Sequence, residues 1–334
     1  MHVILSVAKD LLSSARQKQI LRYAQDDIGK CVTQTTNNPF KSPYLLLSLS
    51  SLFWALNQVF GRGLRDEIPP MAFAFWRWAI AMTVLTALAL PHAIRQWPII
   101  KAAWKPLLVM GLLGTGFHNA LQYVGLQYTT ATNGLLLNSC VPVMVIAFSW
   151  LFLSLTLTRI QRIGVVLSFG GVVAIIVRGD LAVLKQLALN RGDIWILCGL
   201  SFWAIYTICL RWRPATLHPI AFLWVIGIIG LVGLTPFYLF EIASGRHVIA
   251  TPQSIAVLLY TGIFPSLVAF VFWNHGVKQV GPNQASLFLH LMPVFGALMS
   301  ITFLNERLYI FHLIGISLIF IGIYLTTAKR FSPR

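Results

Sequence analysis

Ten long apolar runs, separated by short polar segments, constrain the fold of this chain more than any other feature of its sequence. The hydrocarbon core of a bilayer is about 30 Å thick, so a helix that crosses it needs about 20 apolar residues. Only 10% of the residues are charged, whereas a soluble domain carries about 25%. A β-barrel would show alternating segments of about ten residues, and the sequence has none. We therefore predict an all-α, polytopic membrane protein with ten transmembrane helices.

The predicted spans cover residues 43–60, 70–90, 106–126, 132–154, 160–177, 194–210, 219–240, 253–277, 284–304 and 308–327.

The strong positive charge follows this topology. A net charge of +16 can indicate nucleic-acid binding, but no basic stripe with interleaved aromatic residues lies outside the predicted helices. With the N-terminus inside, 17 of the 25 Lys and Arg residues fall in cytoplasmic segments and seven fall on the opposite side. Cytoplasmic loops carry such an excess. We predict a multi-pass protein of the cell (inner) membrane with cytoplasmic N- and C-termini and no nucleic-acid partner.

An internal duplication is the second constraint. The string FWAL at residues 53–56 recurs as FWAI at residues 202–205, an offset of 149, and Pro70 matches Pro219 at the same offset. From the third run onward the offset is 151, and it relates Gly111 to Gly262, Gly125 to Gly276, Pro142 to Pro293, Gly164 to Gly315 and Gly171 to Gly322. Five helices is an odd number, so the second copy must enter the membrane from the opposite side. We predict two inverted five-helix repeats, over residues 43–177 and 193–327.

Two end segments lie outside the duplication. Residues 1–42 contain six basic and three acidic residues and no spanning run, and we interpret them as a cytoplasmic N-terminal segment that is disordered or a start-site artefact. Residues 328–334 form a short cytoplasmic tail. The four cysteines have no CxxC spacing, which disfavours a zinc site. We expect no metal and no cofactor.

Three short motifs follow one another along the predicted helices. They are Trp54-Ala55-Leu56-Asn57, Phe75-Trp76-Arg77-Trp78, and Asn305-Glu306-Arg307 with Gly315 and Gly322 after it. Together with the repeat, they resemble the EamA branch of the drug/metabolite transporter (DMT) superfamily over about residues 43–327. The chain departs from the family pattern at Asn305, where glycine is usual, and at Leu155 and Thr156, which stand where the first half would carry an acidic–basic turn.

This resemblance implies a transporter rather than an enzyme. It implies ten helices around a central cavity, lined chiefly by helices one, three, four, six, eight and nine. The expected function is secondary transport by alternating access, exporting or exchanging a small metabolite (an amino acid or similar) or a drug. A membrane-embedded enzyme and a passive channel are the alternatives, but the sequence has no convergent catalytic set and no selectivity filter. The expected partners are a small-molecule substrate and the lipid bilayer, and the oligomeric state stays open.

Arg77 is the only basic residue well inside a predicted span. It could contact an anionic group of the substrate, because a guanidinium binds carboxylate or phosphate in bidentate geometry. It could instead be structural, paired with backbone carbonyls and stacked on an aromatic ring. The family commonly has arginine here whatever the substrate, so we favour the structural interpretation.

Polar and aromatic residues on several spans are the candidates for substrate binding, because polar groups inside a membrane usually face the interior of the bundle. Helix packing is the alternative for each of them, and interface anchoring is a further one for the aromatic residues, including Trp273 near the end of the eighth span. Ile319 on the tenth span is expected to face lipid. The candidates are Trp54, Asn57, His118, Gln122, Asn138, Pro142, Trp203, Tyr206, His290 and Pro293.

All acidic residues lie outside the predicted spans or at their edges, so no carboxylate inside the membrane is available to couple transport to protons. Coupling through a carboxylate is therefore disfavoured. His118 and His290 are the intramembrane groups able to titrate near neutral pH, and facilitated exchange without a titrating side chain is slightly preferred.

Overall fold

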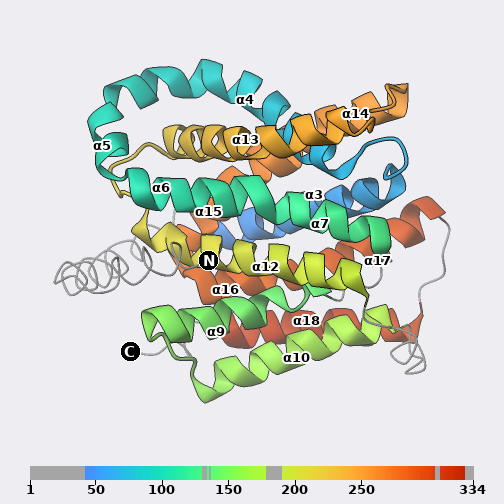
Figure 1. The fold of residues 1–334 in the computed structure, drawn as a ribbon. Coiled ribbons are helices and arrows are strands. Elements are labelled where there is room, and N and C mark those ends of the chain that lie inside the picture. The colour runs from blue at the N-terminus through green and yellow to red at the C-terminus, as the bar shows by residue number, and fades with distance from the viewer. Residues whose placement is uncertain (1–41, 130–133, 135–136, 178–189, 305–308, 328–334) are drawn as a thin grey trace.

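The computed structural model describes residues 42–129, 134, 137–177, 190–304 and 309–327. Every regular element within those residues is a helix, and none is a strand. The helices lie side by side as an elongated bundle (Figure 1). The expectations for residues 1–41, Glu306, Arg307 and the C-terminal tail fall outside the described residues.

The first half of the chain contains α3 (Pro43–Gly63), α4 (Pro70–Arg95), α5 (Trp97–Ala102), α6 (Trp104–Met110), the π-helix η2 (Gly111–Phe117), α7 (His118–Tyr128), α9 (Val141–Leu153) and α10 (Arg159–Ile176).

The second half contains α12 (Arg191–Cys209), the 3-10 helix η3 (Leu210–Trp212), α13 (Pro219–Ala243), α14 (Pro252–Ile263), the π-helix η4 (Phe264–Val268), α15 (Ala269–Val280), α16 (Pro282–Leu287), the 3-10 helix η5 (Phe288–His290), α17 (Leu291–Leu304) and α18 (Ile310–Thr327).

Several helices in the described residues are long and apolar enough to cross a membrane. There are six by length and composition among the described residues, which indicates a multi-pass membrane protein. The count of ten stays a prediction, because the remaining predicted spans are shorter helices or include residues outside the description. The six are Pro43–Gly63, Pro70–Arg95, Arg191–Trp212, Pro219–Ala243, Pro252–Val280 and Ile310–Thr327.

The helices begin where the sequence places favourable first residues. Proline occupies the first helical position of α3, α4, α13 and α14, where its missing N–H costs nothing. Reciprocal capping boxes start α10 at Thr158, α12 at Asn190 and α14 at Thr251, and each satisfies two N–H groups that the helix leaves free.

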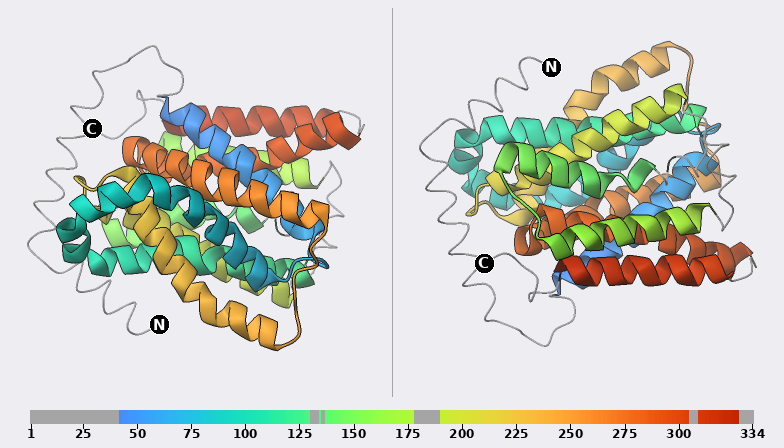
Figure 2. Two further views of the ribbon diagram at one scale, coloured as in Figure 1. Left: turned by 90° about the horizontal axis from the view of Figure 1, so that it is seen from above. Right: turned by 90° about the horizontal axis from the view of Figure 1, so that it is seen from below.

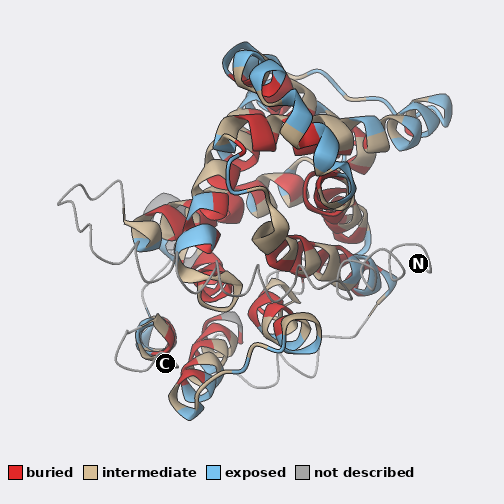
Figure 3. Cartoon of the chain, turned by 90° about the vertical axis from the view of Figure 1, so that its left-hand side faces the viewer, coloured by how far each residue is buried: buried red, intermediate tan, exposed pale blue. Residues whose placement is uncertain are grey.

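Large apolar side chains cover much of the outer surface. Val166, Phe240 and Ile310 are 70%, 75% and 76% exposed, an arrangement that water would penalise and that lipid favours. The buried residues lie on helix faces turned toward neighbouring helices (Figure 3).

Close backbone contact joins α10 to α18, which lie side by side in Figure 1 and in the right-hand view of Figure 2. A Cβ added to Gly171 would lie 2.5 Å from the carbonyl oxygen of Gly315, and one added to Gly315 would lie 2.7 Å from that of Gly171. Only glycine permits this approach. Gly164 and Gly322 make the same reciprocal contact further along the pair.

Ile319 does not face lipid as expected. Its side chain is fully buried and lies against Gly171. The reason is helical periodicity: Ile319 follows Gly315 by four residues, so both lie on the face that α18 turns toward α10.

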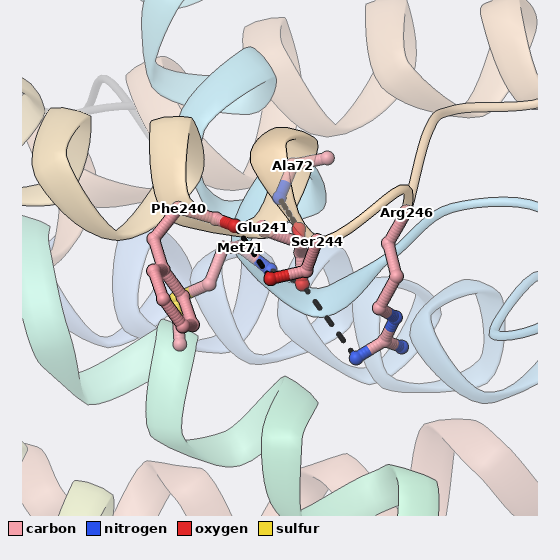
Figure 4. Close-up of polar contacts among 6 residues, drawn as sticks. All are labelled: Met71, Ala72, Phe240, Glu241, Ser244 and Arg246. Carbon is pink, nitrogen blue, oxygen red and sulfur yellow. Dashed lines mark hydrogen bonds and ion pairs between the residues drawn. The ribbon is translucent and has the colours of Figure 1, made fainter.

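A carboxylate ties α13 to the start of α4. Glu241 accepts hydrogen bonds from the backbone nitrogens of Met71 at 3.3 Å and Ala72 at 2.7 Å (Figure 4). The first turn of α4 has no acidic residue and no side-chain cap of its own, so Glu241 meets the positive end of its dipole. Arg246 lies 3.9 Å from the same carboxylate.

Candidate functional site

Five aromatic side chains of α3, α12 and α15 form a buried cluster. It comprises Trp54, Trp203, Tyr206, Phe270 and Trp273, all of them buried. The rings of Trp54 and Trp203 meet edge to face, with centroids 5.0 Å apart. Trp273 lies 5.3 Å from Trp54 and 5.5 Å from Trp203. The two contacts of Trp54 are edge to face, which is a favoured geometry for aromatic rings.

Two π-helices border the aromatic cluster. A π-helix replaces the i→i−4 backbone bonds of an α-helix by i→i−5 bonds and is frequent at functional sites. In η4, the carbonyl oxygen of Pro265 accepts from Trp54 Nε1 at 3.0 Å. In η2, the carbonyl oxygen of Gly114 lies 2.8 Å from His118 Nδ1, and the His118 ring packs against Trp203 with centroids 4.7 Å apart.

A chain of hydrogen bonds runs from Arg77 beside this cluster. Arg77 is fully buried, its Nε donates to Ser266 Oγ at 2.7 Å, and its Nη1 donates to Tyr123 Oη at 2.9 Å. Tyr123 then donates to Asn57 Oδ1 at 2.9 Å. The arginine therefore joins α4 to η4, α7 and α3.

A second tyrosine–asparagine bond mirrors the first. Tyr206 Oη donates to Asn274 Oδ1 at 2.6 Å, joining α12 to α15. Tyr206 lies 149 residues after Asn57, and Asn274 lies 151 residues after Tyr123. The two bonds thus join matched pairs of positions. In the first half the α7 residue donates to the α3 residue, and in the second half the α12 residue, which matches α3, donates to the α15 residue, which matches α7.

Gln122 lies on α7 at the edge of this site. It is buried and accepts a hydrogen bond from Gln58 of α3. The structure thereby brings together seven of the residues singled out from the sequence, which are Trp54, Asn57, Arg77, His118, Gln122, Trp203 and Tyr206.

His290 belongs to a separate polar group. It is fully buried, its Nδ1 lies 2.5 Å from Ser168 Oγ of α10, and its Nε2 lies 3.0 Å from the carbonyl oxygen of Ser139. Asn138 donates to the carbonyl oxygen of Gly134 at 2.8 Å. The segment η5, which contains His290, is joined to α3, which contains Trp54, by a hydrogen bond from Ser51 Oγ to the carbonyl oxygen of Phe288 at 2.7 Å.

The two matched prolines sit at helix starts rather than in helix middles. Pro142 lies in the first turn of α9, and Pro293 lies in the first turn of α17, directly after the 3-10 helix that ends at His290. Both are buried. They therefore mark the points where irregular backbone passes into regular helix.

Sequence reasoning missed Ser266, Phe270 and Ser168, and it read Trp273 as an interface residue. Trp273 is fully buried in the aromatic cluster. The repeat held a usable signal, because Trp273 lies 151 residues after Gln122 and Ser266 lies 151 residues after Thr115. Among the described residues, no three His, Cys, Asp or Glu side chains gather as a metal site.

Comparison with known proteins identifies the family. The sequence profile of the EamA-like transporter family matches the chain twice, over residues 41–177 and 190–328. An uncharacterized transporter of Archaeoglobus fulgidus is 31% identical over 86% of this chain and 98% of its own length. The uncharacterized transporter YyaM of Bacillus subtilis is 27% identical over 84% of this chain and 92% of its own length.

The fold is also similar to a known one. A solved crystal structure, described only as that of a protein, superposes with a TM-score of 0.68 at 17% identity, covering 87% of this chain and 98% of its own. Transporters are thus the common feature of the named relatives, and none of those cited is an enzyme. The chain belongs to the EamA-like transporter family and is a multi-pass membrane transporter.

Proposed function

We propose that the protein is a secondary transporter that exports or exchanges a small metabolite by alternating access. It would sit in the cell (inner) membrane as ten helices in two inverted five-helix repeats, over residues 43–177 and 193–327, with both termini in the cytoplasm. The substrate would bind where the repeats meet, at the aromatic cluster.

The observation that carries this proposal is that contacts recur with their roles exchanged between the halves. Gly171 meets Gly315, and Gly164 meets Gly322, while the offset of 151 relates Gly164 to Gly315 and Gly171 to Gly322. A two-fold axis exchanges the two halves, so each contact between them occurs twice, with the two partners exchanged. The pattern therefore supports a pseudo-two-fold relation between the halves.

A second recurrence involves Gly111, the first residue of η2, and Gly262, near the end of α14. An added Cβ on Gly111 would meet Ile229 and the carbonyl oxygen of Ile226. One on Gly262 would meet Ile80 and the carbonyl oxygen of Arg77, which precede those residues by 149. The same helix crossing is thus built twice.

The aromatic cluster suits a binding site between the repeats. Trp54 and Trp203 are equivalent positions of the two copies and touch each other, so a relative movement of the halves would separate these two rings directly. In transporters built from inverted repeats, the site lies at the repeat interface and rocking of one repeat against the other exposes it. His290 with Ser168, and Pro142 with Pro293, would form the wall on the other side.

Solute counterflow tests the function. Purified full-length protein in liposomes, preloaded with a mixture of the standard amino acids and small organic acids, is diluted into medium that contains traces of the same compounds in labelled form. A carrier predicts a transient accumulation of a labelled compound above its outside concentration, followed by decay. Monotonic equilibration indicates a channel, a new compound indicates an enzyme, and either result contradicts the proposal.

A further inference from the structure

Arg77 has one terminal nitrogen without a partner. Its Nε and Nη1 are bonded to Ser266 and Tyr123, but no atom among the residues that the structure describes accepts from Nη2. The guanidinium is fully buried. Both ion pairs found within the described ranges are elsewhere, at Arg65 with Asp66 and at Arg246 with Glu241.

A buried cation without a counter-ion is costly in a membrane. The equivalent position of the second repeat is Ile226, which is also fully buried, so the matching helix crossing in the other half is built without a charge. At Ile226, the surrounding helix crossing is built from apolar contacts and a backbone carbonyl that accepts from Thr115 at 2.6 Å. The arginine therefore breaks the symmetry of the two halves at a point where packing accepts a hydrocarbon side chain.

The position of Arg77 connects it to the candidate site. Ser266, which holds Nε, follows Pro265, whose carbonyl oxygen holds the Trp54 indole. Tyr123, which holds Nη1, is bonded to Asn57, one helical turn beyond Trp54 on α3. Two further buried donors of this region, Trp78 Nε1 and Trp273 Nε1, also lack an acceptor among the described residues. These three N–H donors are unpaired among the described residues, so a ligand bound here should supply hydrogen-bond acceptors.

We infer that Arg77 is a substrate-binding residue, and that it binds the carboxylate of a small organic acid or amino acid whose remaining part lies against the aromatic cluster. This rests on the proposed transport function and specifies its substrate class. A carboxylate supplies both the missing charge and the missing acceptor, whereas the corresponding primary amide supplies only an acceptor. Hydrogen bonds to a charged group are also stronger than those between neutral groups.

Acid–amide pairs test the inference. The probes are the standard amino acids and succinate, each compared with its primary amide in the counterflow assay on wild-type protein. We expect every transported acid to be favoured over its amide by about tenfold or more in apparent Km. The preference should disappear in Arg77→Gln and in Arg77→Ile, which copies the second repeat, and Arg77→Lys should keep part of it. Arg62→Gln is the matched control, because Arg62 donates to the carbonyl oxygen of Leu126, and it should keep the preference.

The outcomes separate the two levels of the proposal. Transport of acids and amides with equal Km, or an acid preference that survives in Arg77→Ile, overturns the inference and leaves the transporter standing. Counterflow of none of the probes contradicts the transport function and the inference with it. Should the Arg77 variants not fold, thermal unfolding of wild-type protein decides: acids must raise Tm more than their amides, and equal shifts overturn the inference.

Discussion

Trp54 and Trp203 lie 149 residues apart in the chain and touch edge to face, with their planes at 83° and their centroids 5.0 Å apart. Each stands at the same position of its own half. Their contact therefore joins positions of the two halves that the sequence offset matches.

The Trp54–Trp203 contact should couple the two side chains energetically. A double-mutant cycle with Trp54→Leu and Trp203→Leu should give an interaction of about 0.5–1.5 kcal/mol in equilibrium unfolding in detergent. Trp54→Leu also removes the donor to Pro265, so that single change should be the costlier of the two. Trp150, which is 63% exposed, provides the control, because Trp150→Leu should show no coupling to Trp203. If the destabilisations caused by Trp54→Leu and Trp203→Leu are simply additive in the double mutant, the two rings do not interact as described.

The α10–α18 contact offers a comparison of two adjacent glycines. Gly171→Val places side-chain atoms against the backbone of Gly315 and should destabilise the protein by about 1–3 kcal/mol or more. A Cβ added to Gly170 would meet nothing within 4 Å, so Gly170→Val should be almost neutral. Thermal unfolding of the purified variants measures both. Equal losses would mean that the two helices do not approach as closely as described.

Glu241 should act as a cap for α4. Glu241→Ala removes the acceptor for the nitrogens of Met71 and Ala72 and should cost about 0.5–2 kcal/mol of stability. Arg246→Ala should cost much less, since the ion pair is long and its arginine is half exposed. If Arg246→Ala proves as costly as Glu241→Ala, the carboxylate acts as an ion-pair partner and not as a cap.

Trp54 and Trp203 could be singled out from the sequence because the repeat matches them. His118 and Gln122 could be singled out because small and polar residues recur at helical spacing on the third span. The glycines of α10 and α18 were likewise found by their matched spacing, although the burial of Ile319 was read wrongly. These features share one cause: each residue's role is fixed by its position on a regular helix.

Trp273 was assigned to the membrane interface because it stands near the end of the eighth predicted span, where aromatic residues are common. Ser266 was not predicted, and it lies within the π-helix η4, where the inserted residue rotates the following helix by about 100° and the regular helical spacing no longer applies. Ser168 was not predicted for a different reason. Serine is common in membrane helices, and only the packing of α10 against the segment that ends at His290 selects it.

His290 should affect transport more than membrane insertion. His290→Ala removes the group that lies between Ser168 and the carbonyl of Ser139, and a substrate hydrogen bond lost there would cost about 0.5–3 kcal/mol. We expect the apparent Km to rise from a few-fold to about 100-fold, with the amount of protein in the membrane unchanged. Phe320→Leu, on the exposed face of α18, should leave Km alone. A drop in protein amount without a change in Km would assign His290 to folding.

The opposite orientation of the two halves can be measured directly. Lys101 and Ala250 are related by the offset of 149, and both are exposed. In a chain whose four native cysteines are replaced by serine, Lys101→Cys and Ala250→Cys are labelled with a membrane-impermeant maleimide in intact cells and in inside-out vesicles. The inverted repeat predicts that Ala250→Cys reacts in intact cells and Lys101→Cys only in inside-out vesicles. Labelling of both cysteines from the same side would contradict the inverted repeat, and with it the alternating-access account.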